Sequence, residues 1–341
     1  MPNVLEALNA ALHRAFTADE RVYLLGEDIL DPYGGAFKVT RGLATAFPGR
    51  LLTTPISEAG ITGIAAGMAL RGLRPVVEIM FGDFVTLVAD QLINHIAKFR
   101  WMYNDQVQVP LVLRTPMGGR RGYGPTHSQT MEKMFLGVPG LRVLAPCWLG
   151  DPGGLLAQAI LEDDDPVVFV ENKLLYLMPV QNENNLAEFA PASVAYPRLP
   201  GHPSGYAPIF TLTLSQAPAP VLTLVAYGYM AELARQAALR LAYEHEIFVE
   251  LVIPTQLAPF EIEPVIASAH RTGRLLTIEE GTLSLGWGAE IQTRSTEALG
   301  PGLRASRRVA ADDLPIPASG VLEAQVLPDV NRIVQTAQRM V

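Results

Sequence analysis

The stretch TPISEAGITGIAAG, residues 54–67, carries one carboxylate, Glu58, at the head of a run of small and apolar residues. Pro55 and Ser57 are typical of a helix start and predict that a helix begins here. The glycines and alanines that follow would let this helix pack closely against a neighbour. An acid in the first turn also complements the helix dipole, so Glu58 alone has a structural interpretation beside a functional one.

Two further segments favour the functional interpretation. Residues 73–84, LRPVVEIMFGDF, have the composition of a buried strand that ends in aromatic and small residues. Residues 118–129, GGRRGYGPTHSQ, are a glycine-rich stretch with a single histidine, His127. Glycines let a backbone come close to a ligand, and the histidine places a titratable ring there.

The composition excludes several classes of protein. A length of 341 residues predicts two domains, and 49% apolar residues suffice for large cores or broad subunit interfaces. The net charge of −8 and the lack of a basic stripe argue against nucleic acid as a partner. Charges at Arg71, Arg74 and Glu78 interrupt the longest apolar region, so no membrane span is expected. The single cysteine, Cys147, cannot form an internal disulfide, which favours a reducing compartment, the cytoplasm.

The pattern along the chain predicts an α/β fold with two doubly wound domains. Helical and strand-like segments alternate over residues 1–178, which indicates a parallel sheet covered on both faces. Residues 179–220 contain eight prolines and are interpreted as a connector without long regular elements. The alternation resumes over residues 221–341, which predicts a second, smaller domain.

Taken in this order, the segments resemble the β subunit of the thiamine-diphosphate-dependent 2-oxo acid dehydrogenases, the decarboxylating first component of those complexes. The resemblance spans nearly the whole chain. It continues through GED (26–28), VPGLRV (138–143), DPVVF (165–169), EEG (279–281) and GWGAEI (286–291). It implies a transketolase-like, pyrimidine-binding domain over 1–178 and a transketolase C-terminal-like domain over 221–341.

The resemblance also implies the site residues. The aminopyrimidine of thiamine diphosphate acts as an internal base only when an acid is held against one ring nitrogen, and a carboxyl in an apolar pocket suits that task. The family's glutamate falls at Glu58. Phe84 matches the ring that lies on the pyrimidine, Met80 lines the same pocket, and Glu27 matches an acid near the cofactor. His127 matches the histidine that faces the reacting end and assists acyl transfer to lipoyl groups.

The chain lacks the family's magnesium and diphosphate motif, Gly-Asp-Gly followed by Asn. Residues 82–84 lack the second glycine, and residues 150–152 replace it with a proline that has no N–H. We therefore expect an α subunit to hold magnesium and diphosphate, in an α2β2 heterotetramer with contacts between β subunits and to a lipoyl acyltransferase core. Gly137 stands where many relatives carry a second histidine, so no role for that ring is expected here.

A structural potassium ion is implied as well, because Leu111 and residues 160–166 align with loops that hold one in relatives. Backbone carbonyls with a carboxylate suit a large, weakly bound cation. The candidate ligands are Leu111, Ile160, Leu161, Asp163 and Asp165. The alternative is a solvated acidic turn at a helix end.

Three functions remain open at this stage. The first is the β subunit described above, acting on pyruvate, a branched 2-oxo acid or acetoin. The second is the pyrimidine-binding half of a transketolase-like ketol transferase, and the third is a scaffold subunit without chemistry. The presence of both Glu58 and His127 argues against the scaffold.

Overall fold

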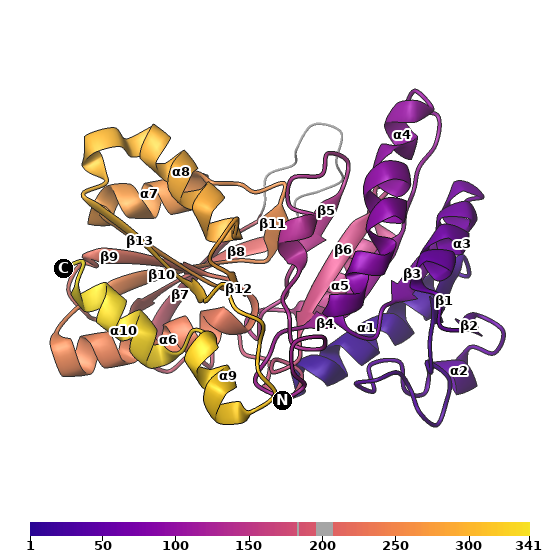
Figure 1. Cartoon of the computed structure of the whole chain (residues 1–341), viewed down its shortest axis with the longest axis horizontal. Coiled ribbons are helices and arrows are strands. Elements are labelled where there is room, and N and C mark those ends of the chain that lie inside the picture. Colours follow the sequence, from indigo (N-terminus) through magenta and orange to yellow (C-terminus); the bar gives the residue numbers. More distant parts are fainter. Residues whose placement is uncertain (183, 196–206) are drawn as a thin grey trace.

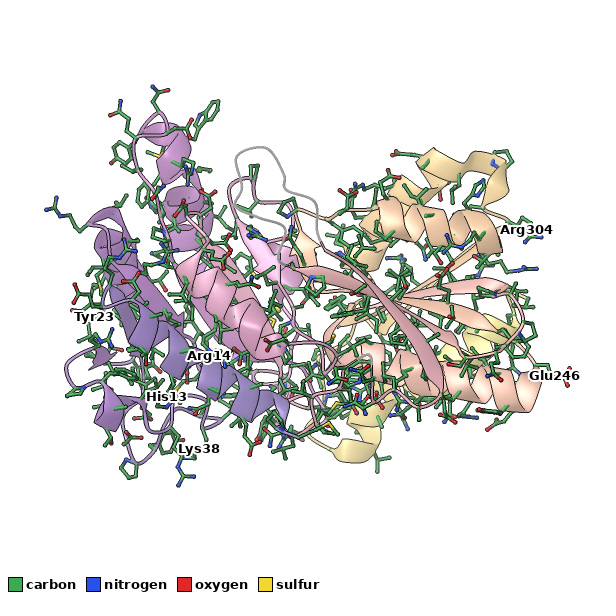
Figure 2. The ribbon with its side chains drawn as sticks, turned by 180° about the vertical axis from the view of Figure 1, so that it is seen from behind. His13, Arg14, Tyr23, Lys38, Glu246 and Arg304 are labelled. Atoms are coloured by element: carbon green, nitrogen blue, oxygen red, sulfur yellow. The ribbon has the colours of Figure 1, made fainter. Side chains whose placement is uncertain are left out.

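The computed structural model describes residues 1–182, 184–195 and 207–341. They form two α/β domains that lie side by side along the long axis of the molecule (Figure 1). Figure 2 shows the same arrangement from behind, with His13 and Tyr23 in the first domain and Glu246 and Arg304 at the far end of the second. None of the helices within these ranges is long and apolar enough to cross a membrane.

The first sheet has seven strands in the described part of the chain, in the order β11-β5-β6-β4-β3-β1-β2. All neighbours pair in parallel except β11, which runs antiparallel to β5. β3 and β4 are buried along their whole length, as expected for a parallel sheet covered on both faces. The strands are β1 (Val22–Gly26), β2 (Leu51–Thr53), β3 (Arg74–Glu78), β4 (Val112–Met117), β5 (Arg142–Leu144), β6 (Val167–Asn172) and β11 (Gln256–Ala258).

Helices cover this sheet, and two of them, α1 and α5, pack against each other. α1 begins with a capping box, because the Asn3 side chain accepts from the Glu6 N–H at 2.8 Å and Glu6 accepts from the Asn3 N–H at 3.0 Å. The helices are α1 (Val4–Ala18), α2 (Leu43–Ala46), α3 (Glu58–Leu70), α4 (Phe99–Met102) and α5 (Pro152–Leu161). The chain between β3 and α4 is irregular, with 3₁₀ turns at Gly82–Val88 and Ile96–Lys98 and a π turn at Gln91–His95.

The second sheet has six strands within the described residues, in the order β13-β12-β9-β10-β8-β7. α6 and α10 pack together on one face and α7 and α8 on the other (Figure 1). The strands are β7 (Phe189–Ala195), β8 (Pro208–Leu214), β9 (Leu222–Ala226), β10 (Val249–Pro254), β12 (Arg274–Thr282) and β13 (Ala305–Ala311). The helices are α6 (Gly228–His245), α7 (Glu263–Thr272), α8 (Trp287–Leu299), α9 (Gly320–Val326) and α10 (Val330–Gln338). Two doubly wound domains are thus confirmed.

The connector predicted over residues 179–220 needs a correction, because β7 and β8 lie within it and form the antiparallel edge of the second sheet. Prolines are compatible with this position. Pro191 lies in the edge strand β7, and Pro208 is the first residue of β8, where a missing N–H breaks little of the ladder. Three of the eight prolines fall in 196–206, outside the described residues.

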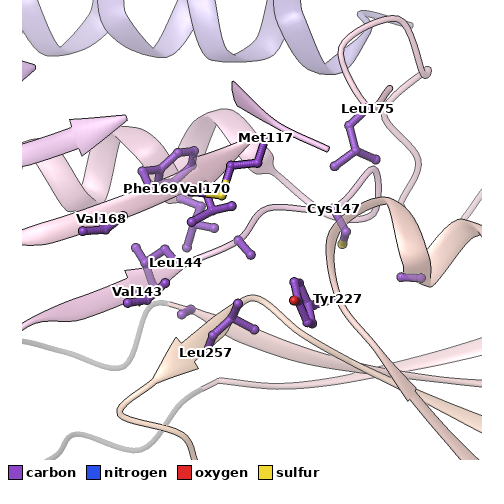
Figure 3. Close-up of a cluster of buried hydrophobic side chains, with 14 of the residues drawn as sticks. Met117, Val143, Leu144, Cys147, Val168, Phe169, Val170, Leu175, Tyr227 and Leu257 are labelled. Carbon is purple, nitrogen blue, oxygen red and sulfur yellow. The ribbon is translucent and has the colours of Figure 1, made fainter. Parts of the chain in front are cut away.

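The two domains share one hydrophobic core. β11 comes from the second half of the sequence but completes the first sheet by pairing with β5. Figure 3 shows part of this shared core, with Tyr227 and Leu257 of the second half and Leu144 and Cys147 of the first. Burial raises the pKa of the Cys147 thiol to about 12, so this cysteine packs as an apolar residue.

Candidate functional site

The predicted cofactor residues meet at one edge of the first sheet. β2, β1, β3 and β4 are adjacent and parallel, so their carboxyl ends lie together, where open α/β sheets bind ligands. Glu27 follows β1, Glu58 follows β2, Met80 and Phe84 follow β3, and the loop with His127 follows β4. The topology therefore brings together five residues that the sequence separates by up to a hundred positions.

Glu58 is the first residue of α3 and is only 7% exposed. In the described part of the chain, no group donates a hydrogen bond to its carboxylate. The preceding Ser57 also makes no side-chain cap to the helix. The residue is thus largely buried while its carboxylate has no hydrogen-bond partner among the described residues, so it fits a ligand that carries a hydrogen-bonding nitrogen.

Glu27 lies beside Glu58 at the end of the neighbouring strand. Burial raises the pKa of Glu27, the negative charge of Glu58 raises it further, and the Ser57 N–H opposes both effects. Its Oε1 atom is buried and has no hydrogen-bond partner among the described residues. A carboxyl group with a raised pKa beside a second acid is suited to hold and exchange a proton.

An aromatic cluster encloses the His127 ring. The ring centroids of His127 and Phe81 lie 4.8 Å apart at 77°, and those of His127 and Phe84 lie 5.2 Å apart at 80°. Tyr123 contacts Phe81 edge-on at 5.9 Å. Phe84 is half-buried and packs against the hydrophobic core as well as against the His127 ring. Sequence reasoning missed Phe81, although it lies only three positions before Phe84.

Lys173 is a second residue that sequence reasoning missed. It directly follows β6, is fully buried, and its Nζ donates to the His127 carbonyl oxygen at 2.5 Å. The ammonium also lies 5.2 Å from the centroid of the Phe81 ring. Burial lowers the pKa of Lys173 to about 8, while Asp83 and Glu280 oppose that shift. The sequence signal that could have indicated Lys173 was a lysine directly after a buried parallel strand.

A buried ion network holds the edge together beneath these residues. Arg114 of β4 donates from Nε to Glu171 of β6 at 2.8 Å and also pairs with Glu78 of β3. The Tyr176 hydroxyl donates to Glu171 at 2.6 Å. Burial raises the pKa of Glu78, and the Arg114 charge opposes that shift. Because one guanidinium joins three adjacent strands, the network fixes the strand ends that carry the site.

The edge fits the pyrimidine part of thiamine diphosphate but not its diphosphate part. It offers a buried acid, aromatic faces and unpartnered polar atoms, which include Asp83 Oδ2 as well as Glu27 Oε1. The two aspartates of the incomplete motifs are engaged elsewhere, since Asp83 accepts from the Gln129 side chain at 2.9 Å and Asp151 caps α5. No cluster of three or more acidic, histidine or cysteine side chains in the described residues is arranged to hold a metal.

The predicted potassium ligands lie at the opposite, amino edge of the sheet, around Arg74. The Arg74 guanidinium donates from Nε to the Ile160 carbonyl at 2.6 Å and from Nη2 to the Asp163 carbonyl. Leu161 is the last residue of α5. Three further candidate groups also have partners. The Asp163 carboxylate pairs with Arg142, and Asp165 pairs with Arg100 at 2.6 Å. The Leu111 carbonyl oxygen accepts from the Val167 N–H at 2.8 Å. These residues do not fit a further cation, and we do not propose potassium.

Exchange of KCl for NaCl at equal ionic strength should therefore leave the thermal midpoint of the chain unchanged to within about 1 °C. An ion bound at 100 times its Kd would stabilise the fold by about 2.7 kcal/mol and shift the midpoint by several degrees. Scanning fluorimetry in the two salts measures this difference. A potassium-specific rise of several degrees in the thermal midpoint would show that K⁺ displaces the guanidinium groups from these oxygen atoms.

The glycine face of α3 has no neighbour among the described residues, whereas its alanine face is buried. Gly60, Gly63, Ile64 and Gly67 are all exposed, and a Cβ built on Gly63 or Gly67 meets no atom within 4 Å. Ile56, just before the helix, is 83% exposed. The face begins at Glu58, so whatever covers it also borders the site.

Comparisons with known proteins agree with this geometry. The family model for the transketolase pyrimidine-binding domain matches residues 1–178, and the model for the transketolase C-terminal domain matches residues 213–333. A pyruvate dehydrogenase E1 component subunit beta-2 of Oryza sativa subsp. japonica is 40% identical over 340 residues, which cover 98% of this chain and 85% of that protein. The β subunit of an acetoin:2,6-dichlorophenolindophenol oxidoreductase of Cupriavidus necator is 34% identical, with 98% and 95% covered.

A bacterial relative and a solved structure complete the comparison. The pyruvate dehydrogenase E1 component subunit beta of Leifsonia xyli subsp. xyli is 36% identical, with 98% of this chain and 94% of that protein covered. A split-gene transketolase, solved as an inactive β4 tetramer, has a TM-score of 0.75 at 20% identity and covers 100% of this chain, which supports the fold alone. The chain therefore belongs to the β subunits of the thiamine-diphosphate-dependent 2-oxo acid dehydrogenases, built from transketolase-type pyrimidine-binding and C-terminal domains.

Proposed function

We propose that this chain supplies the pyrimidine-binding half of the active site in an α2β2 2-oxo acid dehydrogenase, whose α subunit supplies the diphosphate and magnesium half. The observation that carries the proposal is the largely buried Glu58 beside Glu27, at the same strand edge as Phe84 and His127; its carboxylate has no hydrogen-bond partner among the described residues. Oxidative decarboxylation of the 2-oxo acid and transfer of the acyl group to a lipoyl group follow as the reaction.

Each residue has a defined task in this proposal. Bound thiamine diphosphate supplies a thiazolium carbon that serves as nucleophile and electron sink. Glu58 holds a proton against one pyrimidine nitrogen, which activates the base on the same ring. Phe84 offers a flat apolar face to the ring, and Met80 lines the pocket beside it. His127 moves a proton at the reacting end, where the substrate binds and the acyl group leaves.

Glu27 assists Glu58 as a neighbouring acid. Because burial and the Glu58 charge both raise its pKa, Glu27 retains a proton to higher pH than an exposed glutamate does. A protonated Glu27 would spare the pair the repulsion of two buried carboxylates. It would thus let Glu58 stay available for the cofactor.

The exposed face of α3 supports an α subunit as the partner that completes the site. β subunits of this family act as parts of larger enzymes, as the names of the relatives state. The exposed Ile56 and Ile64 flank the start of the helix that carries Glu58. A subunit that covered them would exclude water from the cofactor and could bring the magnesium ligands that this chain lacks.

The isolated chain should bind thiamine diphosphate too weakly for magnesium-dependent binding to appear in the micromolar range. The cofactor's charge lies in its diphosphate, and no metal cluster in the described residues can neutralise it. Titration calorimetry of the chain with and without Mg²⁺ tests this, and the mixture with an α subunit is the positive control. Tight, magnesium-dependent binding to the chain alone would mean that the site is complete without a partner.

Three further features belong to the proposal. The acyl acceptor is a lipoyl group on an acyltransferase core. A second β subunit is a partner, for which Trp101, Met102 and Tyr103 of the exposed α4 segment offer apolar surface. We place the enzyme in the cytoplasm, where its one buried cysteine needs no oxidising conditions. Assays of the reconstituted enzyme with pyruvate, branched 2-oxo acids and acetoin will identify the substrate.

A further inference from the structure

The glycine-rich loop of the first domain is held by two carboxylates of the second domain. Glu280, at the end of β12, accepts from the Gly119 N–H at 2.6 Å. Glu323, on α9, accepts from the Arg120 N–H at 2.7 Å and the Gly122 N–H at 3.2 Å. Both glutamates are nearly fully buried. Three backbone donors of the loop thus end on side chains that are 161 to 203 positions away in the sequence.

The backbone of this loop is shaped to bind an anion. Gly118, Arg120 and Gly122 have φ angles of +95°, +65° and +67°, and alternation of such residues with ordinary ones turns neighbouring N–H groups toward one side. Such concave arrangements usually hold phosphate or another external anion. Here the carboxylates of Glu280 and Glu323 fill the place, and charge-assisted hydrogen bonds in a buried setting are strong.

The contact is too close for a larger residue in the loop. A Cβ on Gly119 would lie 2.6 Å from a methyl group of Leu327 and 3.0 Å from Glu323 Oε1. Further bonds tie the same region, since Asn172 donates to Glu280 at 2.9 Å and Arg120 bonds to the Pro328 carbonyl. The first half of the loop is therefore docked on the second domain along several contacts.

The other end of the loop, at His127, is attached to the first domain. Lys173 donates to the carbonyl oxygen of His127, as described above. Between the two attachments, Tyr123, Pro125 and Thr126 are exposed. The backbone of the loop that carries His127 is thus held by Lys173 at one end and by the two carboxylates at the other, while Phe81 and Phe84 pack against the ring.

We propose that Glu280 and Glu323 are positioning residues, which dock the glycine-rich loop on the second domain so that His127 faces the reacting end of the site. This inference rests on the function proposed for His127. It gives the second domain a role in catalysis through its contacts with the loop. It also accounts for glycine at 119, where the two domains touch.

The test uses the reconstituted enzyme with Glu323→Gln or Glu280→Gln in the β chain. Glutamine keeps the size of the side chain but turns one acceptor oxygen into a donor. That donor then faces a backbone N–H of the loop or, at position 280, the side-chain amide of Asn172 at the end of β6. Arg120 and Arg121 make the loop itself a tryptic site. We expect cleavage there to accelerate about tenfold or more, with a matching loss of amide exchange protection over residues 118–127.

Glu250→Gln is the matched control. Glu250 is equally buried in the second domain, but it accepts from Ser268 and Arg271 of that same domain. Loss of the Glu250 carboxylate should destabilise the second domain and leave the loop docked. Glu280→Asp, which keeps the charge on a shorter arm, should restore part of the protection. Cleavage equal to that of Glu250→Gln in both glutamine variants would overturn the docking.

Lipoyl acylation measured on the same samples tests the positioning role. We expect acylation to fall about tenfold in the glutamine variants, while the KM for the 2-oxo acid changes much less. A loop that opens without any loss of acylation would refute positioning. If the unaltered enzyme itself shows no 2-oxo acid activity, the proposed function fails, and the proteolysis result still decides whether the docking exists.

Discussion

Replacement of Glu58 by Gln is expected to lower kcat of the reconstituted enzyme about a hundredfold or more, the scale of an essential acid–base group. Glutamine fits the space of the buried glutamate and keeps the start of α3 intact. It removes the proton that the carboxyl shares with the pyrimidine nitrogen. The subunit contacts and the thermal midpoint should therefore change little, and the loss should appear in turnover.

Glu263→Gln is the control for this variant, because Glu263 also lies in the first turn of a helix, α7, but is exposed and far from the site. A first-turn acid contributes only about 0.3–1 kcal/mol through the helix dipole. If Glu58 did no more than that, both variants would lose a little stability and no activity. Near-normal turnover of Glu58→Gln would thus show that Glu58 has a structural role only.

Replacement of His127 by Ala should slow acyl transfer to a lipoyl domain about a hundredfold or more, if the ring supplies acid catalysis. Cofactor affinity should hold, because the pyrimidine contacts are proposed to come from Glu58 and Phe84. Single-turnover acylation of a lipoyl domain separates this step from cofactor binding. The ring packs against Phe81 and Phe84, so the measurement must include the thermal midpoint of the variant.

His95→Ala provides the comparison for that variant, since His95 is an exposed histidine of the same domain. It should leave acylation unchanged. An unchanged rate in His127→Ala would contradict the assignment. So would a loss of rate that follows the loss of stability alone, because His127 would then be a packing residue.

The candidate residues Glu27, Glu58, Phe84 and His127 were predicted from the resemblance to the family. The fold brings them to one edge because each follows one of four adjacent parallel strands. The start of α3 at Glu58 was equally accessible from Pro55 and Ser57. The role of each of these residues remains a proposal until the variants are measured.

The parts that sequence reasoning missed depend on contacts between distant segments. The prolines of this region argued against strands, although an edge strand tolerates proline, so β7 and β8 were not predicted. β11 comes from the second half of the chain but joins the first sheet. Lys173 reaches His127 only because β6 lies beside β4. The partners of the expected potassium ligands were missed for a similar reason, because the position of the Arg74 guanidinium among the carbonyls follows from the packing of β3 against the end of α5.

Dye reduction that depends on a 2-oxo acid or acetoin, assayed with this chain and an α subunit separately and mixed, tests the central claim most directly. The account predicts no activity from either subunit alone. It predicts activity in the mixture that reaches a plateau at equimolar subunits and is lost when the β chain carries Glu58→Gln. Activity of this chain alone, or a mixture that is inactive toward pyruvate, branched 2-oxo acids and acetoin alike, would contradict the claim that the chain is the pyrimidine-binding half of such an enzyme.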